Sequence, residues 1–143
     1  MQQDTLKSLR QQVGALLQKS GAHRYKQDVL TPYGVERLRD MTEQQLLHLK
    51  ERLSIICANR ERADEGTRKL RSMVLSLVQD YGYRAREGDW SEVNQFLLRP
   101  QVGGKLLYEM DDDELMKCAK RIRVLLRKRQ EQARREEELK KLN

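Results

Sequence analysis

The chain has 143 residues, of which 36% are charged, 38% are hydrophobic and 5% are aromatic. This length allows one compact domain or two very small ones. Because β-branched and aromatic runs are scarce, the composition disfavours sheets and favours helices with narrow apolar stripes. A formal net charge of +7 favours a polyanionic partner such as nucleic acid or an anionic membrane surface.

The sequence also bears on location. No apolar run approaches the roughly 18 residues of a membrane helix, so we expect no membrane span. The opening residues MQQDTLKSLRQQ lack the apolar core of a secretory signal, and a cytoplasmic location is expected by default. Cys57 and Cys118 lie within helical patterns, and we interpret them as small core residues in a reducing compartment.

Residues 5–19 are predicted to form the first helix. Its apolar side chains recur on one face: Leu6, Leu9, Val13, Leu16 and Leu17. Such a stripe is typical of a helix that buries one side. Asp4 or Thr5 is expected to cap its start, and Gly21 suits the position just after its end.

A second helix is predicted to follow the turn signal Thr31-Pro32-Tyr33-Gly34. Thr42 and Gln45 have the spacing of a capping box, in which each side chain accepts a backbone N–H of the other residue. The helix that follows carries one apolar face: Leu46, Leu49, Leu53, Ile56 and Cys57. It is expected to fade between residues 58 and 66, where ANRERADEG is charged.

Residues 67–81 are predicted to form a third helix that Gly82 ends. Its stripe comprises Leu70, Val74, Leu77 and Val78. Asp89 is then expected to cap a short helix with this apolar side: Trp90, Val93, Phe96 and Leu97. We interpret Trp90 as a core or cap-packing residue.

The last predicted helix begins at Asp111, within the acidic run DDDE. Asp111 and Glu114 have the spacing of an acidic capping box, and first-turn carboxylates also suit the positive end of the helix dipole. The alternative is a Mg²⁺ or Ca²⁺ site, but consecutive helix residues fan out by about 100° each and do not converge on one ion. We therefore interpret this run as a cap and assign no metal ligand.

The two halves of the sequence align as an internal repeat. At an offset of 61 the matched pairs are Leu9/Leu70, Arg10/Arg71, Val13/Val74, Leu16/Leu77, Leu17/Val78 and Gly21/Gly82. At an offset of 69 they are Leu38/Leu107, Met41/Met110, Leu46/Leu115, Arg52/Arg121 and Leu53/Ile122. The eight extra residues fall in the middle connection of the second half. A repeat of this length is a supersecondary unit: a helix, a variable connection and a capped helix.

We therefore expect an all-α protein in which two related helical units pack together, because each alone has few apolar residues. The first helical unit is expected to span residues 1–60 and the second 61–129. Residues 130–143 are expected to extend the long C-terminal helix. Their charged pattern fits either a solvated helix end or an arm that contacts a partner.

Residues that carry catalytic or metal chemistry are few. His23 and His48 lie far apart and are not at ligand spacing with the cysteines, so zinc is not expected. Gly103-Gly104-Lys105 lacks the first glycine and the hydroxyl residue of a phosphate-binding loop. No nucleophile pattern or paired-carboxylate pattern stands out. We expect a protein that is not an enzyme, with no catalytic residue and no cofactor.

Basic residues form two clusters, one in residues 60–71 and one in 117–129. Phosphate contact needs such groups on one face, and part of the second cluster recurs at helical spacing. The predicted nucleic-acid-binding residues are Arg68, Arg71, Lys117, Lys120, Arg121, Arg127 and Lys128. The alternative is a solvated helix side without a partner.

Residues 67–128 contain RKLRSMVLSLVQDYGY, DWSEVNQFL and VGGKLLYEMDDDELMKCAKRIRVLLRK. This series resembles the Mu-like phage regulatory protein GemA family, especially its Bacteroidetes-type members. RLRDMTEQQLLHLKERL in the first half is similar to the family's other recurring helix start, whereas HRYKQDVL matches its early tyrosine segment only loosely. The resemblance implies a small phage or prophage regulator in a bacterial host cell, with no catalytic residue to transfer.

These features together predict a non-enzymatic phage or prophage regulatory protein that binds nucleic acid through basic helix faces. The alternative is a protein–protein adaptor that uses an apolar groove between helices or the C-terminal helix.

Overall fold

The computed structural model describes residues 2–142, which fold into six α-helices and form no β-strand. The helices are α1 (Gln2–Ser20), α2 (Lys26–Leu30), α3 (Glu43–Glu61), α4 (Glu65–Tyr81), α5 (Ser91–Leu98) and α6 (Asp112–Leu142). Four 3₁₀ turns lie between them: η1 (Ala22–Tyr25), η2 (Thr31–Tyr33), η3 (Leu38–Asp40) and η4 (Leu107–Glu109). The predicted all-α class and long C-terminal helix are confirmed.

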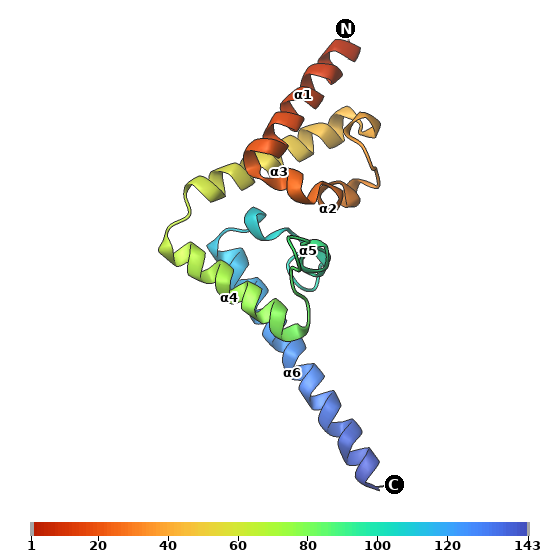
Figure 1. The fold of residues 1–143 in the computed structure, drawn as a ribbon, viewed down its shortest axis with the longest axis vertical. Coiled ribbons are helices and arrows are strands. Elements are labelled where there is room, and N and C mark those ends of the chain that lie inside the picture. The colour runs from red at the N-terminus through yellow and green to blue at the C-terminus, as the bar shows by residue number, and fades with distance from the viewer. Residues whose placement is uncertain (1, 143) are drawn as a thin grey trace.

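The helices form two units in the same order (Figure 1). In the first unit α1 packs on α3, and in the second unit α4 packs on α6. The helices of a pair run in the same direction. In the second unit, Thr67 near the start of α4 donates to Asp112 at 2.8 Å, and Arg129 of α6 donates to the carbonyl of Tyr81 at the end of α4.

A parallel pair needs a connection that carries the chain back along the first helix. That helix is about 26–28 Å long, at 1.5 Å per residue. Residues 21–42 make this return in the first unit with α2, and residues 82–111 make it in the second unit with α5. The variable connection that the repeat predicted is therefore the return path. Gly21 and Gly82 begin the two returns with positive φ angles of 79° and 121°, which glycine adopts without strain.

Each unit has its own hydrophobic core. The fully buried members in the first unit include Val13, Leu30, Leu46, Leu49 and Leu53, and those in the second include Val74, Val78, Phe96, Leu115 and Ile122. Leu106, just before η4, is an exception because it belongs to the second half of the chain but packs in the first core. The two units are thus packed together through η4.

Both predicted capping boxes at the second helices are confirmed. Thr42 Oγ1 accepts the Gln45 N–H at 3.2 Å, and Gln45 Oε1 accepts the Thr42 N–H at 3.0 Å. Asp111 Oδ1 accepts the Glu114 N–H at 2.8 Å, and Glu114 Oε1 accepts the Asp111 N–H at 3.2 Å. The acidic run at 111–114 therefore starts a helix, as its match to the first unit predicted.

α1 begins at Gln2, before the predicted cap residues Asp4 and Thr5, and the side chain of Asp4 lies outside the described part of the structure. The prediction that Asp89 caps α5 is wrong. α5 has Trp90 at its N-cap, and Asp89 binds only the N–H and hydroxyl of Ser91, at 3.0 and 2.6 Å. Trp90 also lies outside both cores, with 37% of its surface exposed. Val93 and Phe96 form the buried apolar side of α5, to which Trp90 does not contribute.

α3 ends at Glu61 and α4 begins at Glu65, so the predicted fading of the helix is a short break. Cys118 is buried and Cys57 is half-buried, and both are free thiols. None of the helices formed by residues 2–142 combines the length and apolarity that crossing a membrane requires.

Candidate nucleic-acid interface

The position of α6 depends on an ion pair between the units. Arg52 of α3 binds both carboxylate oxygens of Glu109 in η4, and the contact between Nη2 and Oε2 measures 3.2 Å. Glu109 also accepts the N–H of Leu106 at 2.8 Å. Burial disfavours the charged Arg52 guanidinium, but its hydrogen bond and charge attraction to Glu109 outweigh this, so the pKa of Arg52 is raised. This pair fixes η4, and thereby the start of α6, against α3.

Tyr108 forms the second contact between the units. The guanidinium groups of Arg60 and Arg71 both contact its ring, with their central carbons 4.5 and 4.7 Å from the ring centre. Its carbonyl accepts the Asn59 side chain at 3.0 Å. Cation–π contacts of this kind add to the attraction between the units.

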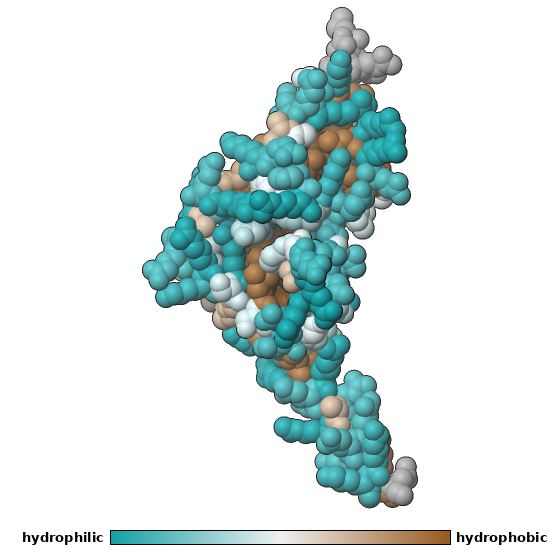
Figure 2. Space-filling view, viewed as in Figure 1, coloured by the Kyte–Doolittle hydropathy of each residue, from teal (hydrophilic) through white to brown (hydrophobic). Residues whose placement is uncertain are grey.

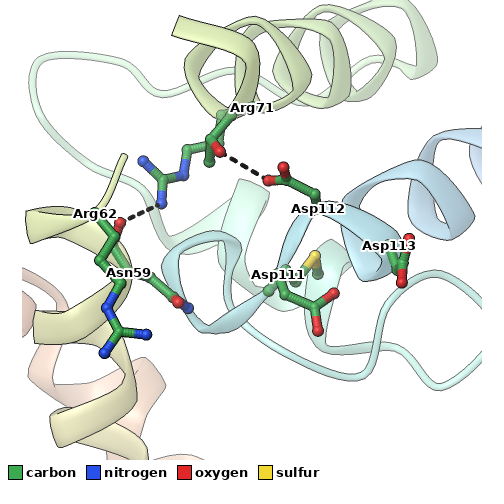
Figure 3. Close-up of a pocket in the computed structure, with 8 residues that line it drawn as sticks. Asn59, Arg62, Arg71, Asp111, Asp112 and Asp113 are labelled. Carbon is green, nitrogen blue, oxygen red and sulfur yellow. Dashed lines mark hydrogen bonds between the residues drawn. The ribbon is translucent and has the colours of Figure 1, made fainter. Parts of the chain in front are cut away.

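Arg71 is buried in this contact, with 7% of its surface exposed. Its Nη2 donates to the Asn59 carbonyl at 3.2 Å, a bond drawn in Figure 3. Burial lowers the pKa of Arg71, as do the positive charges of Arg60 and Arg68. A guanidinium held in this way is not presented to a phosphate. We therefore take Arg71 out of the predicted nucleic-acid surface.

The first turn of α6 lies beside Arg71. Figure 3 shows Asp111, Asp112 and Asp113 projecting in different directions from this turn. Asp112 accepts the Thr67 hydroxyl, and Asp111 caps the helix. Among the side chains that the structure describes, residues 5–142, no group of three His, Cys, Asp or Glu is placed to hold a metal ion.

The other predicted residues on α6 are all exposed: Lys117, Lys120, Arg121, Arg127 and Lys128. None of these five side chains forms a hydrogen bond or an ion pair with another described side chain, residues 5–142. We call them the α6 basic face. They occupy roughly 120° of the helix circumference, opposite the buried residues Leu115 and Ile122. The face is about 17 Å long, at 1.5 Å per residue.

This part of α6 accounts for the net charge of the protein. Residues 116–130 contain seven basic side chains and no acidic one, whereas the whole chain contains 29 basic and 22 acidic residues. The remaining residues therefore carry 22 charges of each sign and are neutral as a group. The space-filling view shows the hydrophilic surface along the projecting part of α6 (Figure 2).

The two other cations of this segment have structural roles. Arg123 Nη2 lies 3.2 Å from the sulfur of Met73, and the Arg129 guanidinium lies 3.8 Å from the centre of the Tyr81 ring. Both contacts hold α6 against α4. Neither residue belongs to the predicted set, and both lie nearer the helix side that carries the core.

Arg68 lies apart from the α6 basic face. It is exposed on the first turn of α4, near Arg71 and the acidic start of α6. The structure therefore brings five of the seven predicted residues together on one helix. Sequence reasoning missed Arg52, Tyr108 and Glu109, which position that helix, because no local pattern marks a contact between residues 57 positions apart.

Comparison with protein-family models, with curated proteins and with solved structures finds no match for this chain. The resemblance to the GemA family rests on the quoted motifs and stays a prediction.

Proposed function

We propose that this protein is a nucleic-acid-binding protein rather than an enzyme, and that the α6 basic face contacts the phosphate backbone. The observation that supports this most strongly is the concentration of net charge on one exposed helix segment with five unpaired cations. Surface lysines and arginines that serve only solubility can be interspersed with acidic residues and need not gather on one segment. Phosphate groups along a strand, in contrast, match a row of cations on one face.

The chemistry of the face is that of electrostatic binding. Lysine and arginine neutralise phosphates and release counterions, which makes affinity fall steeply with salt. If about four of the five cations contact phosphates, the slope of log affinity against log salt is about −4 for a duplex. The segment between Lys117 and Lys128 has no asparagine or glutamine that could read base edges. The proposed binding therefore tolerates many sequences.

The test is a salt titration of a fluorescently labelled duplex, followed by anisotropy. The double variant Lys120→Glu, Arg121→Glu should weaken binding at least tenfold and reduce the salt slope by about two. Lys7→Glu, Lys26→Glu is the matched control, since both lysines are exposed and the change in net charge is the same. Equal weakening by the two variants would point to net charge alone. Wild-type protein with no salt-sensitive binding to DNA or RNA at low salt would refute the proposal.

A protein–protein adaptor is the second candidate function. Its support is a set of exposed apolar side chains on α6: Met116, Val124, Leu139 and Leu142. Apolar groups among cations suit an acidic amphipathic partner. A pull-down that recovers a stoichiometric protein partner after nuclease treatment would favour this function. Deletion of 130–143 should then abolish recovery if the helix end takes part.

A role in phage or prophage regulation is the finer part of the proposal. Its support is the resemblance of residues 67–128 to the GemA family. Transposition or head-morphogenesis genes adjacent to the coding sequence would strengthen it, and a neighbourhood of housekeeping genes would count against it.

A further inference from the structure

Trp90 is the only tryptophan of the chain, and the backbone around it is closely constrained. Residues 86–89 form a tight turn, in which Arg86 and Asp89 exchange two backbone hydrogen bonds of 3.3 and 2.9 Å. Glu87 and Gly88 hold positive φ angles of 53° and 81° at its tip. The carbonyl of Trp90 then accepts the Asn94 N–H of α5 at 2.8 Å. The turn and the helix thus fix the tryptophan backbone from both sides.

Two hollows lie on either side of this tryptophan, with volumes of about 110 and 350 Å³. Both are lined in part by Leu75, Trp90 and Val93, so the two hollows adjoin at the tryptophan and together outline one groove. We call it the Trp90 groove. It extends from the junction of the units along the outside of α4.

The walls of the groove combine aromatic rings with arginines. Tyr25 and Tyr108 line the smaller hollow, and Tyr83 lines the larger one. Arg24 and Arg84 line the two hollows, and their exposed side chains form no hydrogen bond or ion pair with the described side chains of residues 5–142. These cations are free to meet an anion.

Acidic groups are kept out of the groove. No Asp or Glu of residues 5–142, whose side chains the structure describes, is among the lining of either hollow. The nearest in sequence, Asp89, directs its carboxylate to Ser91. An exposed indole with cations on both sides and no lining carboxylate is complementary to a planar group that carries negative charge. An unpaired nucleobase with its phosphates is such a group, since it stacks on aromatic rings while arginine binds the backbone.

We infer that the Trp90 groove binds an unpaired base of single-stranded nucleic acid, stacked on the indole, with the flanking phosphates at Arg24 and Arg84. The inference rests on the proposed function and names its substrate class, because the α6 basic face alone does not distinguish a strand from a duplex. A duplex keeps its bases stacked on each other and cannot offer one to the indole without unpairing. The groove therefore adds a preference for single strands.

Trp90 is its own probe, because all indole emission of the protein comes from it. The experiment titrates full-length protein with a thymidine dodecamer, a duplex of equal length and a thymidine mononucleotide. Emission is excited at the red edge of the indole band, where bases absorb weakly. In parallel, anisotropy of the labelled strand and duplex measures binding itself. The single strand should quench the emission with the same midpoint as its anisotropy curve, while the duplex binds without quenching.

Trp90→Ala should weaken strand binding about tenfold and leave duplex binding unchanged, as expected for the loss of one stacked base. Trp90→Phe keeps a ring and should retain most of the affinity, which separates stacking from loss of fold. Arg84→Gln should weaken strand binding more than duplex binding, with Arg86→Gln on the neighbouring turn as its control.

Strand and duplex binding with a silent tryptophan would overturn the inference and leave the proposed function standing. Binding of neither would overturn both. If the mononucleotide quenches the Trp90 emission to the same extent as the single strand, at the same nucleotide concentration, the ligand of the groove is a free nucleotide and not a strand.

Discussion

The two units share a scaffold but differ in what covers the outer side of the second helix. In each unit an arginine at the same repeat position, Arg60 or Arg129, donates to the last carbonyl of the first helix, at Ser20 or Tyr81. On α3 the adjacent outer side is covered by η4. On α6 the equivalent side is the exposed α6 basic face. The same local framework therefore serves an internal contact in one unit and leaves an open surface in the other.

Arg52 and Arg121 illustrate this difference, because they match in the repeat and have opposite environments. Arg52 is bound by Glu109, whereas Arg121 is exposed and has no ion-pair partner among the described side chains of residues 5–142. A segment that bound Arg121 as η4 binds Arg52 would need the features of η4. The first unit's own counterpart, η3, has Arg37 where the second unit has the buried Leu106. A charged residue there cannot enter a core, so η3 is not an equivalent anchor.

The largest effects are expected at matched core positions. Leu53 and Ile122 are both fully buried, and Leu53→Ala or Ile122→Ala should each lower the free energy of unfolding by about 3 kcal/mol. If η4 couples the units, either change shifts one shared transition in a denaturant titration followed by circular dichroism. The controls Leu47→Ala and Met116→Ala, at exposed matched positions, should stay within about 0.5 kcal/mol. Two separate transitions would show that the units unfold independently.

The ion pair between the units should come next. Glu109→Ala leaves Arg52 partly buried without its carboxylate, and should cost about 2 kcal/mol of stability, less than for a fully buried pair. Asp40→Ala at the matched, exposed position of η3 should cost less than about 0.5 kcal/mol. Chemical denaturation measures both. An equal loss of stability in the two variants would contradict the view that η4 binds the first unit whereas η3 makes no equivalent contact with the second unit.

The two capping boxes should have smaller and similar effects. Thr42→Ala and Asp111→Ala each remove a side-chain acceptor from the first turn of a long helix, at a cost of about 1 kcal/mol. Thermal unfolding measures both against wild-type. A loss of divalent-cation binding on Asp111→Ala, detected by calorimetry, would mean that the acidic run is more than a cap.

The two cysteines should differ in how fast alkylating reagents modify them. Burial raises the pKa of Cys118 to about 11, so its thiol is almost entirely protonated near pH 8, and only the thiolate attacks alkylating reagents. Cys57 is half-buried and should be modified first, as mass spectrometry after a short alkylation can show. The rate at Cys118 should increase as pH rises toward 11. Faster modification of Cys118 than of Cys57 at pH 8 would mean that the second core opens readily.

The sequence predicted the parts of the fold that depend on neighbours along the chain. Apolar spacing predicted α1, α3, α4, α5 and α6 but not the five-residue helix α2. Thr42/Gln45 and Asp111/Glu114 predicted the two capping boxes, and the repeat related the two halves. Contacts between distant segments left no such signal. Spacing indicates that a helix has a buried side, but it does not say which segment covers the opposite side, as η4 covers α3.

The same distinction explains the candidate site. The α6 basic face could be predicted because its five cations recur on one helix. Arg71 could not be separated from them, because the sequence does not show whether an arginine stacks on a distant ring such as Tyr108 or faces solvent. For Trp90 the sequence left a core position and a position packed at a helix cap open, and the structure places it at the N-cap of α5 with 37% of its surface exposed.

The central claim is that the matched outer sides of α3 and α6 differ in that only α6 binds nucleic acid. Backbone amide shifts of ¹⁵N-labelled protein, recorded with and without a short duplex at low salt, test this most directly. We predict shift changes concentrated in residues 117–128 and little change in the matched residues 48–59. Changes concentrated in residues 48–59, or none in 117–128 despite binding, would contradict it.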